Sequence, residues 1–516
     1  MKVSLLLIVC FSLLTAACKR DDDAGAVVGT GEITSTELRE HVRFLASDDL
    51  GGRRIGSAGI KTAEIYISEQ MSDAGLDPLP GQADFFLDFP LQAHSFDPDA
   101  TRLAILGENP FKLVLGTDFR PFAFSNTGEF NGDIVFAGYG ITAPEYQYDD
   151  YGKIDVEGKI VLILRHEPEV GETGDKFLGR RYTKHALFAE KAKNAADHGA
   201  IAMILVTDPL FRTTPEDLRL QERFSFPDTE LSERERSRIP SLQISQDSAK
   251  RLLRLDATSF NDLQRRIDSG ELLGAIQMDL PLDTITVAGA VAIRESPRTV
   301  EARNVAGYLE GVEDYWLILG AHHDHIGRFE GPGDTIYNGA DDNASGTALL
   351  LELAEYYGRK EAMPPWNLVF ITFSAEEVGL FGSRAFTQSG WLDIDQIAMM
   401  MNFDMIGRNP DDPLDIFGDG FVDGSAELVG SVAMSVGLEV ELQGQVHEPM
   451  SDHHIFYELQ IPFLMFHSDL HGDYHQITDH YELLDYDKME KIGIFTTAFV
   501  DRLVSLGEMP IWVGKP

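Results

Sequence analysis

The chain has 516 residues, which at roughly 150 residues per domain predicts about three domains, or one large domain that carries an insertion. Its 43% hydrophobic and 25% charged residues are the balance of a globular protein with a sizeable core, and they exclude a disordered or collagen-like chain. The formal net charge of −41 would repel nucleic-acid phosphates and anionic lipid head groups. We therefore expect no nucleic-acid partner, and any attachment to a membrane must be covalent.

The first residues have the pattern of an export signal. A basic start and an apolar run over 3–14 precede small residues at 15–17, which predicts a signal peptide over 1–17 and a polar tether over 18–32. The sequence Thr-Ala-Ala-Cys that ends at Cys18 resembles a bacterial lipoprotein box, so lipidated Cys18 is the expected membrane anchor. The expected location is the bacterial cell envelope, facing the periplasm or in the outer membrane; without lipidation the protein would be secreted.

The two cysteines of the chain, Cys10 and Cys18, both fall in this segment. The rest of the protein therefore has no disulfide and no thiolate ligand, and a metal site must use His, Asp and Glu.

The remaining elements divide the chain into three parts. The part over 33–129 opens with a predicted helix, for which Thr36 is the candidate N-cap, and a second helix is expected over 58–74. The part over 130–283 is predicted to be an inserted α+β module, with strands over 132–140, 158–164 and 201–206 and a helix over 186–198. From 284 to 516 strands and helices alternate, which predicts an α/β fold with a mixed, mostly parallel sheet flanked by helices.

Four apolar strands of the last part each lead into acidic or imidazole side chains. The strands are expected over 315–321, 367–373, 397–403 and 461–466, and they lead to His322 and Asp324, to Glu376 and Glu377, to Asp404, and to His475. A glycine-bounded turn over 339–346 contains Asp342 and feeds a helix expected over 344–356. Because the carboxyl ends of parallel strands meet at one edge of a sheet, we expect these side chains to converge.

Such a cluster requires cations. Several carboxylates and imidazoles at one edge would repel one another strongly unless metal ions neutralised them. Oxygen and nitrogen donors without thiolate suit zinc, with manganese or cobalt as alternatives. Two ions that share a bridging carboxylate are typical of two-metal hydrolases. The pattern therefore predicts a metal-dependent hydrolase.

These motifs resemble those of the co-catalytic zinc aminopeptidase family, which includes the bacterial leucyl aminopeptidases, with glutamate carboxypeptidase II and the transferrin receptor as relatives. Besides the metal motifs, the resemblance includes the segment 45–50, Gly52-Arg53 and Asn304-Val305. The inserted module resembles a protease-associated domain, through Gly138-Tyr-Gly and Asp149-Asp-Tyr. The resemblance implies the zinc exopeptidase fold, with 33–129 and 284–516 as the two segments of the peptidase domain.

The resemblance also implies roles for particular residues. His322 and Asp404 would bind one Zn²⁺, Glu377 and His475 would bind a second, and Asp342 would bridge both through its carboxylate, followed by a cis peptide bond. Glu376 would be the general base for a water between the two ions, Asp324 would accept the other N–H of His322, and Tyr474 would donate to the oxyanion. The implied activity is hydrolysis of the N-terminal residue of peptide substrates.

Other polar side chains near the motifs are expected outside the metal site. His323, His325 and Asp341 flank the ligands in this sequence without being ligands in the family pattern. The segment 451–454 resembles a family loop that is expected to shape the substrate pocket. His467, His471 and His480 are expected to be bystanders.

Three other functions are weighed against this one. A non-catalytic receptor or scaffold of the same fold would lack part of the metal set, whereas all the ligand positions and Glu376 are filled here. A carboxypeptidase acting on acidic peptides would need an arginine patch, for which Arg328, Arg384 and Arg408 lie near the motifs. A glutaminyl cyclase would use one zinc ion and normally lacks the inserted domain.

Overall fold

A computed structural model describes residues 32–514, except for 169–176, 178–182, 211–217, 228, 230–235, 272, 330–332, 447–448 and 508. The expected signal peptide and the Cys18 anchor lie outside the described residues. Among the helices that are described, none is both long enough and apolar enough to span a bilayer.

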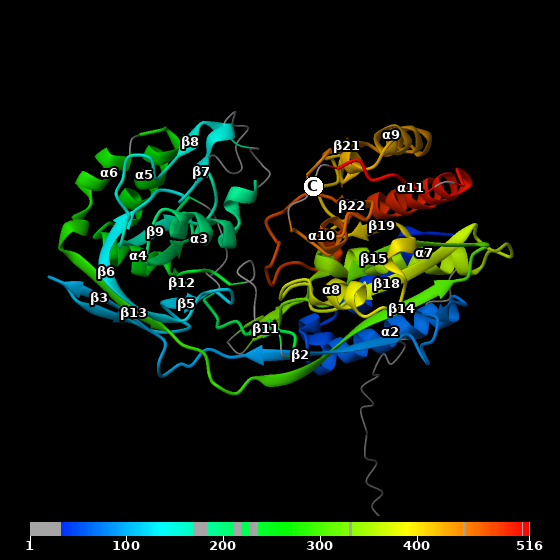
Figure 1. The fold of residues 1–516 in the computed structure, drawn as a ribbon, viewed down its shortest axis with the longest axis horizontal. Helices are drawn as coiled ribbons and strands as arrows, with labels where there is room; N and C mark the ends of the chain where they lie inside the picture. The colour runs from blue at the N-terminus through cyan, green and yellow to red at the C-terminus, as the bar shows by residue number, and fades with distance from the viewer. Residues whose placement is uncertain are drawn as a thin grey trace, which may run out of the picture.

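The larger of two units is built on a mixed sheet of ten strands (Figure 1). Its order is β11 (Arg223–Ser225), β2 (Phe86–His94), β14 (Arg298–Leu309), β18 (Trp366–Phe373), β15 (Glu313–His322), β19 (Ile397–Phe403), β22 (Phe463–His467), β20 (Leu414–Phe417) and β21 (Val440–Leu442), with β1 (Asp77–Pro78) paired to β14. The four central strands β18, β15, β19 and β22 are parallel. Their carboxyl ends therefore lie next to one another at one edge of the sheet, as expected from the sequence.

Helices cover both faces of this sheet. One face carries α1 (Ser35–Leu45), α2 (Ala58–Asp73), α7 (Gly346–Gly358), α9 (Ser425–Val436) and α11 (Tyr486–Ser505), and the other carries α8 (Phe381–Gln388) and α10 (His453–Glu458). Strand β15 shows why two layers form. Its Leu317 and Leu319 join the core with α7 and α11, whereas Ile318 packs into a separate core with Phe386 and Phe456. A strand buried on both faces is typical of the centre of an α/β sheet.

The first helix begins two residues before the sequence predicted. Its N-cap is Thr34, whose hydroxyl accepts from the backbone N–H of Glu37, and Thr36 lies inside the first turn. The Thr34 hydroxyl also donates to Oε2 of Glu37 at 2.8 Å, which adds a second bond between the cap and the first turn.

The second unit has its own sheet, core and helices. Its strand order is β4 (Phe111–Leu113), β3 (Arg102–Gly107), β13 (Ile285–Val291), β6 (Gly128–Phe136), β9 (Ile160–Leu164), β10 (Ala202–Val206), β12 (Ser241–Ile244) and β5 (Phe119–Pro121). The helices are α3 (Phe188–Asp197), α4 (Gln246–Leu253), α5 (Ala257–Asp268) and α6 (Leu273–Asp279), and a short hairpin joins β7 (Thr142–Ala143) to β8 (Tyr148–Asp149). This is an α+β arrangement.

The second sheet extends beyond the range 130–283 expected for the insertion. Strands β3, β4 and β5 precede that range and β13 follows it. They belong to the sheet because β13 pairs antiparallel with β3 on one side and with β6 on the other. The sequence patterns of β3, β4 and β5 do not indicate which of the two sheets these short strands join.

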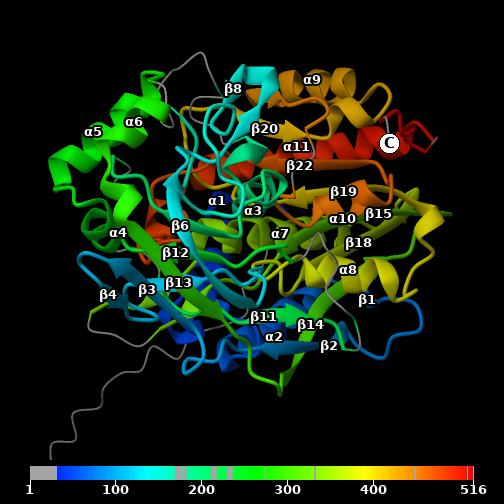
Figure 2. The same ribbon diagram turned by 60° about the vertical axis from the view of Figure 1, so that its left-hand side comes forward.

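Two extended segments join the units (Figure 1). Strand β2 pairs antiparallel with β14, and an isolated bridge links Phe96 to Ile293 farther along the same two segments. Strand β11 comes from the inserted sequence but pairs with β2 at the edge of the large sheet, as Figure 2 shows from the side. The insertion therefore contributes an edge strand to the sheet of the larger unit.

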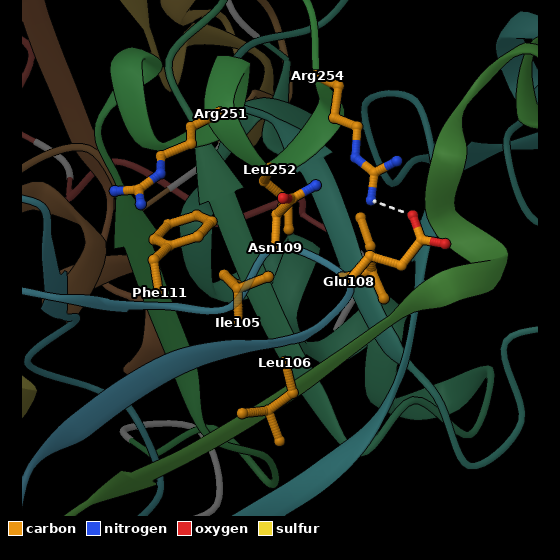
Figure 3. A pocket seen from close by; sticks show the side chains of 9 residues that line it. Ile105, Leu106, Glu108, Asn109, Phe111, Arg251, Leu252 and Arg254 are labelled. Carbon is orange, nitrogen blue, oxygen red and sulfur yellow. Dashed lines mark hydrogen bonds and ion pairs between the residues drawn. The ribbon is translucent and has the colours of Figure 1, made fainter.

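A pocket lies in the second unit (Figure 3). Arg254 and Glu108 form an ion pair of 3.2 Å at its rim, and the guanidinium of Arg251 lies over the ring of Phe111. Its lining residues are Ile105, Leu106, Glu108, Asn109, Phe111, Arg251, Leu252, Arg254 and Ile285. None of these residues belongs to the motifs at the strand ends, so this pocket is separate from the candidate site.

Candidate metal centre

The side chains predicted at the strand ends do converge. Strand β15 ends at His322, Phe373 at the end of β18 is its neighbour in register, and β19 ends one residue before Asp404. Groups of potential ligand atoms form around His322 with Glu376 and Asp404, and around Asp342 with Glu377 and His325. The parallel centre of the sheet thus brings together segments that are far apart in the sequence.

Asp342 lies between two groups of donors, and each of its carboxylate oxygens faces one group. Oδ1 lies 3.3 Å from Nε2 of His322, which is itself 3.4 Å from Oδ1 of Asp404. Oδ2 lies 3.1 Å from Nε2 of His475, which is 3.2 Å from Oε2 of Glu377. These side chains fall into the two groups that the resemblance implied.

The donor set fits zinc. Two zinc bonds of about 2.0–2.1 Å at the tetrahedral angle separate their donor atoms by about 3.3 Å, close to the four observed separations. The donor Oδ1 of Asp404 is buried and makes no hydrogen bond within the described part of the chain. Burial of a carboxylate oxygen without a hydrogen bond is costly unless a cation satisfies it.

Exposure is uneven around the centre. The side chains of His322, Asp342, Asp404 and Glu377 are all less than a tenth exposed, whereas His475 is 36% exposed. Glu376 also keeps partial exposure. Among these side chains His475 is therefore the most accessible to solvent.

The electrostatics of the cluster reflect its crowding. Burial lowers the pKa of His475, but Glu377 and Asp342 outweigh it and raise the pKa to about 10. For Asp342, burial raises the pKa, and the imidazoles of His325, His322 and His475 overcome this and hold it well below the ordinary value. Partial burial raises the pKa of Glu376 well above its ordinary value, with His322 opposing the shift and Glu377 adding to it. The carboxylates thus require nearby positive charge, which divalent cations supply.

The turn Ala340–Ser345 positions Asp342 ahead of α7. The carboxylate of Asp479 accepts from the backbone N–H groups of Asp341 (2.9 Å) and Asp342 (3.2 Å). The side chain of Asn343 donates to the carbonyl oxygen of Phe403, which precedes Asp404. The peptide bond between Asp342 and Asn343 is cis, as the resemblance implied.

Asp324 acts differently from the expectation. Nδ1 of His322 donates to the backbone carbonyl oxygen of Asp324 at 3.2 Å, whereas its carboxylate oxygen is 3.9 Å away. This carboxylate instead accepts from the backbone N–H groups of Glu376 (3.1 Å) and Glu377 (3.4 Å). The carbonyl fixes the tautomer of His322 that leaves Nε2 free for a metal, and the carboxylate holds the glutamate loop.

The sequence reasoning missed His325. Its Nδ1 donates to Oε1 of Glu377 at 2.6 Å, which leaves Oε2 of the same carboxylate facing His475. The ring has room because Gly339 lies against it: a Cβ at Gly339 would be 2.5 Å from the ring. The signal in the sequence was its position three residues after His322, in the same loop.

The other residues near the motifs have structural partners. His323 lies 3.9 Å from Glu64, and Asp341 accepts from the backbone N–H of Gly407 and lies 3.2 Å from His471. Tyr474 stacks on His475 with ring centroids 3.9 Å apart. His467 donates to the backbone carbonyl oxygen of Asp404, Ser451 accepts from Asn402, and His454 lies 3.7 Å from Glu458.

An open α/β sheet with imidazoles and carboxylates gathered around one shared aspartate at its carboxyl edge is the architecture of a metallohydrolase. Comparison with known families agrees: residues 304–500 match the model of peptidase family M28, and residues 128–252 match the PA domain. The chain therefore contains a segment that matches peptidase family M28 and, ahead of it, a segment that matches the PA domain.

Several curated proteins are similar to parts of this chain. Leucine aminopeptidase 1 of Phaeosphaeria nodorum is 31% identical over 156 residues, which cover 29% of this chain and 40% of that protein. Aminopeptidase NAALADL1 of Rattus norvegicus is 25% identical over 423 residues, covering 69% of this chain and 51% of that protein. The probable lipoprotein aminopeptidase LpqL of Mycobacterium tuberculosis is 38% identical over 126 residues, or 23% of each chain. The chain thus matches about half, or less, of the length of these relatives.

Solved structures share the fold over most of the chain. The aminopeptidase from Aneurinibacillus sp. strain AM-1 superposes with a TM-score of 0.56 at 22% identity, covering 94% of this chain and 97% of that one. A zinc aminopeptidase from Bacillus subtilis gives a TM-score of 0.54 at 19% identity, covering 91% and 95%. Both neighbours support the zinc exopeptidase fold expected from the sequence.

Proposed function

We propose that this protein is an exported aminopeptidase that holds two Zn²⁺ ions per chain and removes N-terminal residues from peptides. The observation that carries the proposal is the division of the Asp342 carboxylate between His322 and His475, at 3.3 and 3.1 Å. One ion would be held by His322, Asp404 and Asp342, and the other by His475, Glu377 and Asp342.

Zinc in such a site polarises a carbonyl and lowers the pKa of water, which makes peptide hydrolysis possible at neutral pH. Glu376 is the base that takes the proton of the attacking water and delivers it to the leaving amine. Its partial exposure suits a group that must meet water. We assign to Tyr474, beside His475, the donation of a hydrogen bond to the oxyanion.

Two alternatives are less well supported. A scaffold without activity would not need a complete donor set with separations suited to zinc. Two of the three arginines that a carboxypeptidase could use are already paired, Arg384 with Glu458 at 3.4 Å and Arg408 with Asp473 at 2.5 Å. The similar proteins named above are called aminopeptidases, which favours action at the N-terminus.

We further propose that the protein is a lipoprotein of the bacterial cell envelope, anchored through Cys18. The sequence around Cys18 supports this, and one similar protein is called a probable lipoprotein aminopeptidase. The strong negative charge of the chain leaves acyl chains as its attachment.

A metal assay combined with a substrate panel tests the activity. The purified protein is analysed for zinc and then offered leucine p-nitroanilide, the same compound with an acetylated N-terminus, and N-blocked peptides with a C-terminal glutamate. We expect two zinc ions per chain and cleavage of the first compound alone. Cleavage of the C-terminal glutamate, or a single zinc ion at saturation, would contradict the proposal.

A further inference from the structure

Arg53 is a buried arginine whose partners are the segments that hold the metal ligands. It lies at the end of the turn Asp48–Arg53 between α1 and α2, and it is 1% exposed. Its Nε donates to the carbonyl oxygen of His323 at 2.9 Å, and Nη2 donates to that of Gly339 at 2.9 Å. Nη1 donates to the carbonyl oxygens of Asn338 (2.7 Å) and Leu45 (2.5 Å).

These carbonyl groups belong to two different loops of the centre. His323 directly follows the ligand His322, and Gly339 lies at the start of the turn that carries Asp342. One planar guanidinium therefore joins the two loops. Its rigid fork of donors fixes the distance between them in a way that a flexible ammonium group does not.

The neighbouring chain supports this placement. The main-chain carbonyl of Arg53 accepts from the N–H of His325, at 3.3 Å. Gly52 has a φ of +72°, and a Cβ there would lie 2.4 Å from the carbonyl oxygen of Tyr337. The glycine thus allows the turn to approach the loop before Asp342 closely enough for Arg53 to reach both segments.

The charge of Arg53 also faces the centre. Burial lowers its pKa to about 10, and Asp342, Asp324, Asp479 and Glu377 oppose that shift. At neutral pH the guanidinium stays charged, although all four of its hydrogen bonds go to neutral carbonyl groups. It is a fixed cation beside the carboxylates of the cluster.

We propose that Arg53 is a positioning residue of the metal centre: it sets the distance between His322 and Asp342 and thereby the affinity for one of the two metal ions. The proposal rests on the two-zinc function proposed above. It extends that function because the residue lies about 270 positions before the loops that it joins and touches no donor atom of the metal set.

The test compares Arg53→Lys with Arg223→Lys. Lysine keeps the charge but cannot bond all four carbonyl groups. Arg223 is the matched control, since it is 7% exposed and its guanidinium also binds backbone carbonyl groups, those of Ala123 and Ser125, away from the centre. Each protein is stripped of metal, titrated with zinc against a chromophoric chelator, and separately loaded with cobalt(II) for its absorption spectrum.

We expect Arg53→Lys to bind one zinc ion at least about tenfold more weakly than the wild type, with a changed cobalt spectrum, while Arg223→Lys binds both ions normally. A folded Arg53→Lys protein with wild-type affinities and spectrum would overturn the proposal. If wild-type protein binds fewer than two zinc ions, the proposed function itself fails.

A second variant keeps the test decisive if Arg53→Lys does not fold. Gly52→Ala keeps the Arg53 side chain but would place a Cβ 2.4 Å from the carbonyl oxygen of Tyr337, which pushes the turn and Arg53 away from the loop before Asp342. We expect weaker binding of one zinc ion here too, and Gly51→Ala, whose Cβ would meet no atom within 4 Å, is the control. A folded Gly52→Ala protein with wild-type zinc affinities would overturn the proposal.

Discussion

The adjacent glutamates of the centre offer a sharp test of the proposed roles. Glu376 and Glu377 share one loop, and both backbone N–H groups are held by Asp324. Only Glu377 has both carboxylate oxygens engaged, at 2.6 Å from His325 and 3.2 Å from His475. The same substitution at the two positions should therefore have different consequences.

Glu376→Gln removes the proposed proton acceptor and leaves in place the five residues proposed to bind the two ions. We expect two zinc ions to remain and kcat to fall about 10²- to 10⁴-fold, the usual contribution of a general base, which corresponds to about 2.7–5.4 kcal/mol in activation free energy. Glu377→Gln instead removes a charged ligand, and we expect one zinc ion to be lost together with activity.

The assay is release of p-nitroaniline from leucine p-nitroanilide, measured beside zinc content after dialysis. A Glu376→Gln enzyme with kcat within tenfold of wild type would refute the role of Glu376 as base. Loss of a zinc ion from that variant would show that Glu376 is a ligand, in keeping with its position near His322 and Asp404.

Three more predictions follow from the centre and its surroundings. Removal of metal with a chelator should abolish activity, and zinc should restore it; activity that survives complete removal would contradict a zinc enzyme. Gly52→Ala should lower the free energy of unfolding by about 1–3 kcal/mol more than Gly51→Ala, because both positions have positive φ but only Gly52 would bring a Cβ against backbone; equal losses in denaturant unfolding would contradict this. Cys18→Ser should move the protein from the membrane to the soluble fraction, and unchanged fractionation would indicate attachment through another protein.

The strand ends could be predicted from the sequence because an apolar run that ends in polar residues indicates both a buried strand and a candidate site residue. Central strands such as β15 and β18 are buried on both faces, so they appear as continuous apolar runs, and the polar residues that end them are conspicuous. Parallel pairing then places those ends at one edge. The convergence of His322, Glu377 and Asp404 followed from these two facts.

The sequence could not predict the orientation of side chains in loops or the pairing of short strands. His323 and His325 lie in the same loop, but the first faces Glu64 and the second faces Glu377. The carboxylate of Asp324 was assigned to the wrong partner for the same reason, since a loop has no fixed period to set its orientation. Strand β11 has only three residues, and its pairing with β2 depends on the position of the whole insertion.

The centre also shows how loops from separate strands are held together. Two carboxylates accept from backbone N–H groups: Asp324 from the loop of Glu376, and Asp479 from the turn of Asp342. Arg53 supplies the complementary contact, since it donates to carbonyl groups of the loops on either side. The sheet brings the loops to one edge, but these contacts between loops set the separations of the donor atoms. Sensitivity of metal binding to mutation should therefore follow these contacts, and it should extend to the turn between the first two helices, far from every ligand in the sequence.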